Sequence, residues 1–123
     1  MAQNLVSMVI TQEQQAAALA GIAQAEAALG GLVSLEPAVR KRMRYMGPKS
    51  AEFARGTVRL LAANTHIVPP SLDLAGAEED LAAFDALRPV LEALQRLYSR
   101  VDDTVMALGS DVMDLAFEGY GQL

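Results

Sequence analysis

The sequence has no cysteine, no tryptophan and a single histidine, His66. Without cysteine there are no disulfides, no thiol nucleophile and no thiolate ligands for zinc or iron–sulfur clusters. One histidine excludes metal sites that need two or more histidine ligands. No set of nucleophile, base and orienting group converges in the sequence. We therefore expect no metal, no cofactor, no small-molecule substrate and no enzymatic activity.

Aromatic residues are also scarce, at 5% of 123 residues, although 52% of the chain is apolar. This length corresponds to one domain. A core built from small and aliphatic side chains favours closely spaced helices over a sheet sandwich. No apolar run approaches the 18 residues of a membrane span, and no secretory signal is visible. We expect a cytoplasmic helical protein without a membrane span.

The net charge of −5 conceals an uneven distribution of charge. Residues 36–60 hold seven basic and two acidic side chains, whereas residues 73–123 hold eleven acidic and three basic ones. An overall acidic chain is a poor non-specific ligand for nucleic acid. We therefore do not expect nucleic acid as a partner of the whole surface.

The segment Asn4–Ile10 is short, apolar and partly β-branched, which predicts a strand or an extended arm. No second segment of the chain is a comparable strand. An unpaired strand edge is a template for another copy of the chain. We expect contacts between copies through these residues: Leu5, Val6, Met8, Val9 and Ile10.

Helix boundaries are marked along the rest of the chain. Thr11 and Gln14 have the spacing of a capping box, which predicts a helix over residues 12–29 that ends at Gly30-Gly31. Pro37 suits the first turn of a short helix.

A second long helix is predicted over residues 48–63, with Asn64 as a left-handed stop. Phe53, Leu60 and Leu61 mark its apolar line. Asp73 is the expected cap of the next helix.

The clearest pattern follows Asp73, where apolar residues recur in alternating steps of three and four. Such a heptad repeat over more than three heptads is typical of coiled-coil packing. Its members are Phe84, Leu87, Leu91, Leu94, Tyr98, Val101, Val105 and Leu108. Pro89 is expected to kink or divide this helix near Leu87, and Gly109 to end it. Ser110 would then cap a final helix from Asp111.

The predicted fold is thus all-α: a four-helix bundle of residues 11–123 with a proline-kinked heptad helix, preceded by an extended arm of residues 1–10.

Several motifs between residues 30 and 120 resemble a group of small bacterial helical proteins that have no established activity. They are Arg40–Arg44 leading into Met46-Gly47-Pro48-Lys49-Ser50, then Pro69-Pro70, Leu87-Arg88-Pro89, Asp103-Thr104 and Gly109-Ser110. Members of that group often carry an acidic residue in place of Pro48, and they tend to extend beyond the last residue of this chain. The resemblance implies a helical fold and no particular function.

Two hypotheses for function follow from these patterns. The first is a self-associating interaction or structural protein, a homo-oligomer built through the arm and the helix faces. The alternative is binding of an anionic ligand or nucleic acid by the basic segment, whose candidates are Arg40, Lys41, Arg42, Arg44 and Lys49. Asp111, Asp114 and Glu118 share one helix face, which we interpret as a solvated acidic surface.

Overall fold

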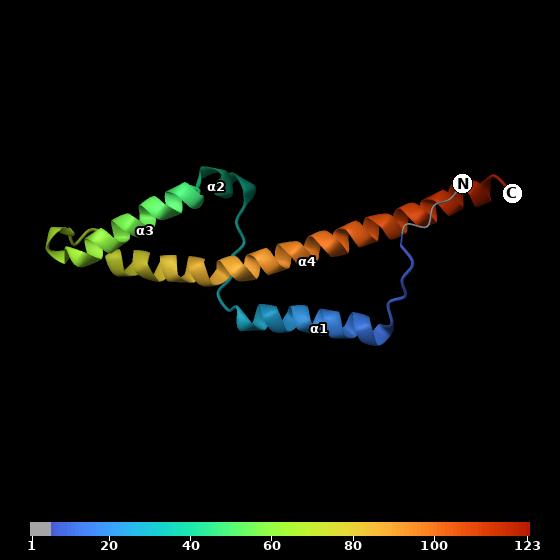
Figure 1. Cartoon of the computed structure of the whole chain (residues 1–123), viewed down its shortest axis with the longest axis horizontal. Helices are drawn as coiled ribbons and strands as arrows, with labels where there is room; N and C mark the ends of the chain where they lie inside the picture. Colours follow the sequence, from blue (N-terminus) through green and yellow to red (C-terminus); the bar gives the residue numbers. More distant parts are fainter. Residues whose placement is uncertain (1–5) are drawn as a thin grey trace. The chain divides into compact units, whose positions relative to one another are not determined.

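The structure is a computed structural model that describes residues 6–123, and every regular element in that range is helical. The described residues form four α-helices, which are labelled in Figure 1, and a 3₁₀ turn between the third and the fourth. The elements are α1 (Gln12–Ala28), α2 (Pro37–Arg42), α3 (Pro48–Ala63), η1 (Thr65–Ile67) and α4 (Leu74–Tyr120). For the described residues, the prediction of an all-α protein is confirmed.

The first helix begins and ends where the sequence predicts. The Thr11 hydroxyl accepts a hydrogen bond from the Gln14 amide at 3.0 Å, and the Gln14 side chain accepts one from the Thr11 amide at 2.9 Å. This reciprocal capping box satisfies two amides that a helix start leaves unpaired. After the helix, Gly31 adopts φ +88°, a left-handed conformation that glycine enters without steric cost.

The bounds of α3 also match the prediction, but its stop signal works differently. Asn64 has φ −133°, so the predicted left-handed conformation is wrong. Its side-chain amide instead donates to the Leu60 carbonyl at 2.8 Å, while η1 continues the turn. A side-chain donor thereby satisfies one of the orphan carbonyls at the end of the helix.

Of the kink or division predicted near Leu87, the division is wrong, and the helix end predicted at Gly109 is wrong as well. The helix α4 is continuous over 47 residues and passes through both Pro89 and Gly109. Pro89 removes a single backbone donor, and Gly109 keeps helical backbone instead of the left-handed conformation of a helix stop. The helix predicted from Asp111 is therefore the last part of α4. The predicted cap is present, since the Asp73 carboxylate accepts from the Gly76 amide at 2.9 Å.

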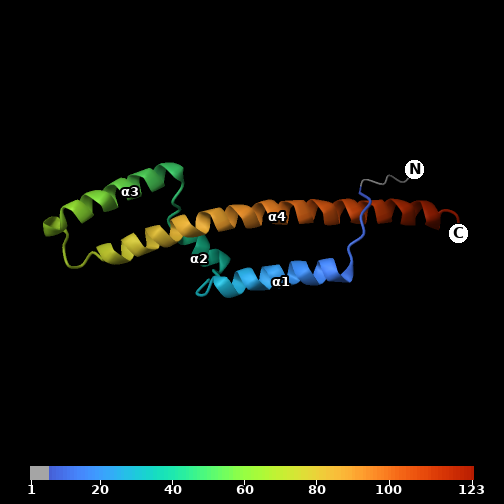
Figure 2. The ribbon, with the colours of Figure 1, turned by 60° about the horizontal axis from the view of Figure 1, so that its bottom comes forward.

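Residues Pro37–Leu97 form one compact unit. Within it, α3 and the first part of α4 run back along each other through η1, as Figures 1 and 2 show; we call this pair the α3–α4 hairpin (residues 48–97). Half-buried apolar side chains from both helices and from the segment before α3 meet around one hollow: Met46, Ala54, Val58, Leu81 and Phe84. The predicted apolar line of α3 is wrong in part, because Phe53 and Leu60 are 75% and 67% exposed.

The other unit joins the described residues up to Glu36 with Tyr98–Leu123. Every residue of α1 is exposed, including Leu19 and Ile22 at 60% and 49%.

No described residue is buried, although half of the chain is apolar. This is true of each unit by itself, because removing the other unit can only expose more surface. Each unit by itself therefore contains helices and local contacts, but no buried hydrophobic core among the described residues.

The continuity of α4 leads to a test with two glycines. Gly109 lies inside the helix, and a Cβ added there meets no atom within 4 Å. We expect Gly109→Ala to raise stability by about 1 kcal/mol, because alanine loses less backbone entropy in a helix. Thermal unfolding followed by circular dichroism at 222 nm measures the change.

The matched control is Gly31→Ala, which places a Cβ at φ +88°. We expect it to lower stability by about 1 kcal/mol, since a non-glycine residue is strained there. A Gly109→Ala protein that melts at a lower temperature than the parent would mean that α4 ends near this residue in solution.

Candidate functional site

The most extensive chemical feature of the structure is an apolar face of α4 that is exposed over most of its length and half-buried at Phe84 and Leu108. The heptad residues lie on one face of the helix; we call this face the α4 seam, and its residues are Phe84, Leu87, Leu91, Leu94, Tyr98, Val101, Val105 and Leu108. Leu91 and Leu94 are 50% and 47% exposed, and Tyr98 is 72% exposed. A face of this kind normally packs against another helix.

The seam continues beyond the residue at which sequence reasoning stopped. Val112 and Leu115 extend the alternation by further steps of four and three, and they are 63% and 64% exposed. The sequence prediction does not include them, because Gly109-Ser110 predicts a helix boundary. The unbroken heptad spacing across Gly109 is the signal that identifies them.

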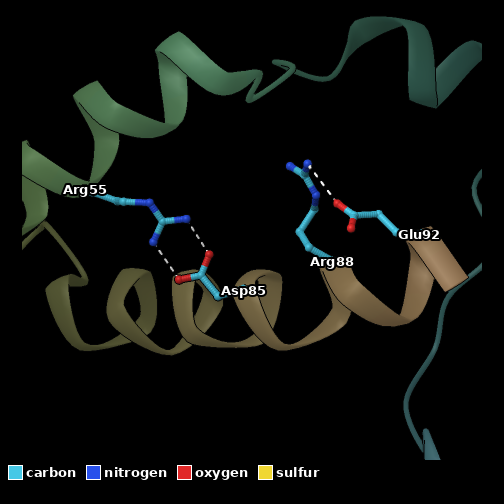
Figure 3. A network of polar contacts seen from close by, with 4 residues as sticks. All are labelled: Arg55, Asp85, Arg88 and Glu92. Atoms are coloured by element: carbon cyan, nitrogen blue, oxygen red, sulfur yellow. Dashed lines mark hydrogen bonds and ion pairs between the residues drawn. The ribbon is translucent and has the colours of Figure 1, made fainter.

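A bidentate ion pair joins the two helices of the α3–α4 hairpin (Figure 3). Arg55 of α3 donates from Nη1 to Asp85 Oδ2 at 2.6 Å and from Nη2 to Asp85 Oδ1. The planar guanidinium matches both carboxylate oxygens, which makes this geometry more specific than a single contact. The sequence offered no signal for this pair, because the two residues lie 30 positions apart.

The charges around Asp85 stabilise its ionised form. Its pKa lies below the ordinary value of 3.8, first because Arg55 donates to the carboxylate and then because Arg55 and Arg88 carry positive charge nearby. The pKa of Arg55 is correspondingly raised by Asp85. One turn further along α4, Arg88 lies 3.7 Å from Glu92 and 5.5 Å from the Phe84 ring centroid.

The ion pair lies at the edge of an open hollow between α3 and α4. The lining combines both charges with small and aliphatic side chains: Arg55, Val58, Arg59, Ala62, Glu78, Leu81, Ala82 and Asp85. None of these side chains is a hydroxyl, thiol or imidazole. The arrangement positions one helix on another and leaves groups of both charges at the surface.

The described part of the N-terminal arm has no regular structure over residues 6–10. Val6 is half-buried, and its amide donates to the Asp111 carboxylate at 3.2 Å. Met8, Val9 and Ile10 are exposed at 46%, 84% and 56%. Leu5 lies outside the described residues. The arm therefore touches α4 through Val6 and leaves three apolar side chains uncovered.

The five basic candidates lie in and after α2 and at the start of α3, and all are exposed. None of them forms an ion pair with another described residue. Arg40, Lys41 and Arg42 occupy the last turn of α2, where helix carbonyls attract cations and not anions. At the start of α3, Pro48 has no amide to offer an anion.

The other polar candidates show no ligand geometry. The structure contains no group of three or more histidine, aspartate or glutamate residues that could hold a metal ion within residues 6–123. Asp111 bonds to Val6 instead, and His66 lies exposed in η1. Over the same residues, no helix has the length and hydropathy needed to cross a membrane.

Comparisons with known protein families, curated proteins and solved structures give no match for this chain. The resemblance to small bacterial helical proteins stays a prediction.

The ion pair of the hairpin predicts a specific pH dependence. Because the pKa of Asp85 is depressed in the folded state, its stabilising contribution is present above the ordinary value of 3.8 and is lost as pH falls through the lower folded value. We expect Arg55→Gln to move the Asp85 pKa upward toward its ordinary value. A carboxyl-carbon NMR titration of both proteins measures this shift.

Arg59→Gln is the control, because Arg59 lines the same hollow one turn along α3 without bonding Asp85. It should leave the Asp85 titration unchanged. Identical titrations in the parent and Arg55→Gln proteins would mean that the pair does not form in solution.

Proposed function

We propose that this chain is a self-associating structural module, a homo-oligomer whose helices complete a bundle with helices of other copies. The observation that carries the proposal is the exposed α4 seam, supported by the absence of any buried residue in the described chain. Removing apolar surface from water is the main favourable term in protein association. A second copy offers the same seam, so two copies cover each other.

The magnitude of this effect favours association. Full burial of one leucine or valine side chain contributes roughly 1.5–3 kcal/mol. In a single chain the seam side chains stay largely exposed, so most of this free energy is gained only when a partner buries them. Val112 and Leu115 add further exposed apolar surface. Two such faces meeting along more than three heptads form a coiled-coil interface, with knobs from one helix in holes of the other.

Two further features support self-association over another role. The basic residues of 36–60 and the acidic residues of 73–123 are complementary between copies, and the five basic candidates are without ion-pair partners in the described chain. The exposed apolar residues of the arm add a contact surface at the other end of the sequence. Complementary charge steers encounter and selects the correct partner.

Binding of an anionic ligand or nucleic acid by the basic segment has less support. An anion at this segment would lie near the carbonyl end of α2, which disfavours negative charge, and Pro48 would offer it no backbone amide. One aromatic residue, Tyr45, lies in the segment, which is little for base stacking. The exposed basic side chains are accounted for equally by acidic surfaces of other copies.

A single charge in the seam tests the proposal. Leu94→Glu places a carboxylate at a position that is 47% exposed in one chain, so the chain should keep its helicity. In an oligomer the same carboxylate would be buried, which is costly without a partner. We expect the dissociation constant, measured by sedimentation equilibrium, to rise at least a hundredfold.

Ser99→Glu is the matched control, because it adds the same charge to the same helix at an exposed position outside the seam. It should leave the dissociation constant within about threefold of the parent value. A parent chain that sediments as a monomer at tens of micromolar contradicts self-association.

Deletion of residues 1–10 separates the arm from the helix faces. We expect the deleted protein to remain an oligomer through the α4 seam but with a dissociation constant about tenfold higher, because the apolar contacts of Met8, Val9 and Ile10 are lost. Light scattering over a concentration series measures this. An unchanged dissociation constant would show that the arm takes no part in assembly.

A further inference from the structure

The α4 seam has the same spacing when it is read from either end. Its steps of three and four run symmetrically from Phe84 to Leu108, with the midpoint at Arg96, so the spacing fits either orientation of a partner helix, and the layers and the flanking residues distinguish the two. Resting on the self-association proposed above, we infer that α4 pairs with α4 of a second copy in antiparallel orientation, centred on Arg96. The occupant of the seam is thus the same seam of another chain.

Antiparallel pairing gives layers of even volume. Phe84 meets Leu108 of the partner subunit. Leu87 meets Val105 of the partner subunit, and Leu91 meets Val101 of the partner subunit. Leu94 meets Tyr98 of the partner subunit, and the same layers repeat on the other side of the centre. Parallel pairing in register would instead stack leucine on leucine at one end and valine on valine at the other. Close packing favours the even arrangement, since helix separation then stays constant.

The residues that flank the seam distinguish the two orientations further. In the antiparallel pair, Arg88 lies beside Asp102 of the partner subunit, and by symmetry this contact occurs twice. Leu97, which lies beside the seam and is 50% exposed, meets Leu97 of the partner subunit at the centre. Parallel pairing would place Leu97 beside a partner aspartate and Arg88 beside a partner alanine. Charge and apolar contacts both favour the antiparallel orientation.

A chain without cysteine permits distance measurements from a single introduced label. Arg96→Cys and Met113→Cys place a nitroxide on the side of α4 away from the seam, and Met113 is 51% exposed. In the antiparallel pair, the two labels at position 96 lie within about 30 Å of each other, because packed helices are close. Position 113 lies on opposite sides of the centre in the two helices. Its two labels are therefore about 50 Å apart at a rise of 1.5 Å per residue.

Pulsed electron paramagnetic resonance on both labelled full-length proteins reads out these distances. A short distance at position 96 with a long one at position 113 supports the antiparallel pair. Short distances at both positions show parallel helices and overturn the inference.

Charge exchange provides a test that needs no label. We expect Arg88→Asp to raise the dissociation constant about tenfold, because the new carboxylate faces an aspartate twice. Adding Asp102→Arg should restore the dissociation constant to within about twofold, since the pair is then present with its charges exchanged. Arg96→Asp, on the outer side of the helix, is the control and should change the dissociation constant less than twofold.

The outcomes separate this inference from the proposed function. A parent protein that is monomeric by sedimentation overturns both. A parent oligomer in which Asp102→Arg fails to rescue Arg88→Asp, or in which position 113 gives a short distance, retains self-association but overturns the antiparallel orientation.

Discussion

The uncovered apolar face of α4 is the constraint on which the rest of this protein depends. A helix of 47 residues far exceeds the length at which helices are marginal in isolation, yet most helical stability in proteins comes from packing an apolar face. In the described chain, nothing packs on that face closely enough to bury a residue. In the self-association proposed above, this exposed face would be covered by another copy of the chain.

The α3–α4 hairpin shows how far one chain satisfies this constraint by itself. Ala54, Val58, Leu81 and Phe84 become half-buried, and Arg55 and Asp85 connect the two helices with paired hydrogen bonds. Both charged groups are exposed, so the pair directs the register of the hairpin more than it stabilises it. Most of the seam lies beyond the hairpin residues that meet, and its residues from Leu87 to Val105 are exposed.

Pro89 and Gly109 illustrate why α4 tolerates residues that usually end helices. Pro89 lies on the side of α4 away from the seam, where its ring does not disturb the apolar face. The missing donor leaves one carbonyl, that of Asp85, without its helical partner. Gly109 lowers helix propensity by roughly 1 kcal/mol, a cost that the neighbouring good helix formers offset. A long-range apolar pattern therefore outweighs two local signals.

Local chemistry made part of the fold readable from the sequence. The capping box of Thr11 and Gln14, the left-handed Gly31 and the start of α3 at Pro48 are properties of a few adjacent residues, and all three agree with the structure. The heptad spacing also identified the apolar face of α4, because helical periodicity requires only sequence neighbours. These features follow from interactions within one or two helical turns.

Only the tertiary structure decided which residues from distant parts of the chain meet. The bond between Arg55 and Asp85 and that between Val6 and Asp111 join residues 30 and 105 positions apart, and no local pattern marks them. The inward face of α3 was likewise misjudged at Phe53 and Leu60, because hydrophobicity alone does not say which side of a helix faces its neighbour. The sequence by itself determined where helices form and which stripe on α4 is apolar. The structure showed that the described chain leaves this stripe uncovered, since packing depends on the arrangement of all helices at once.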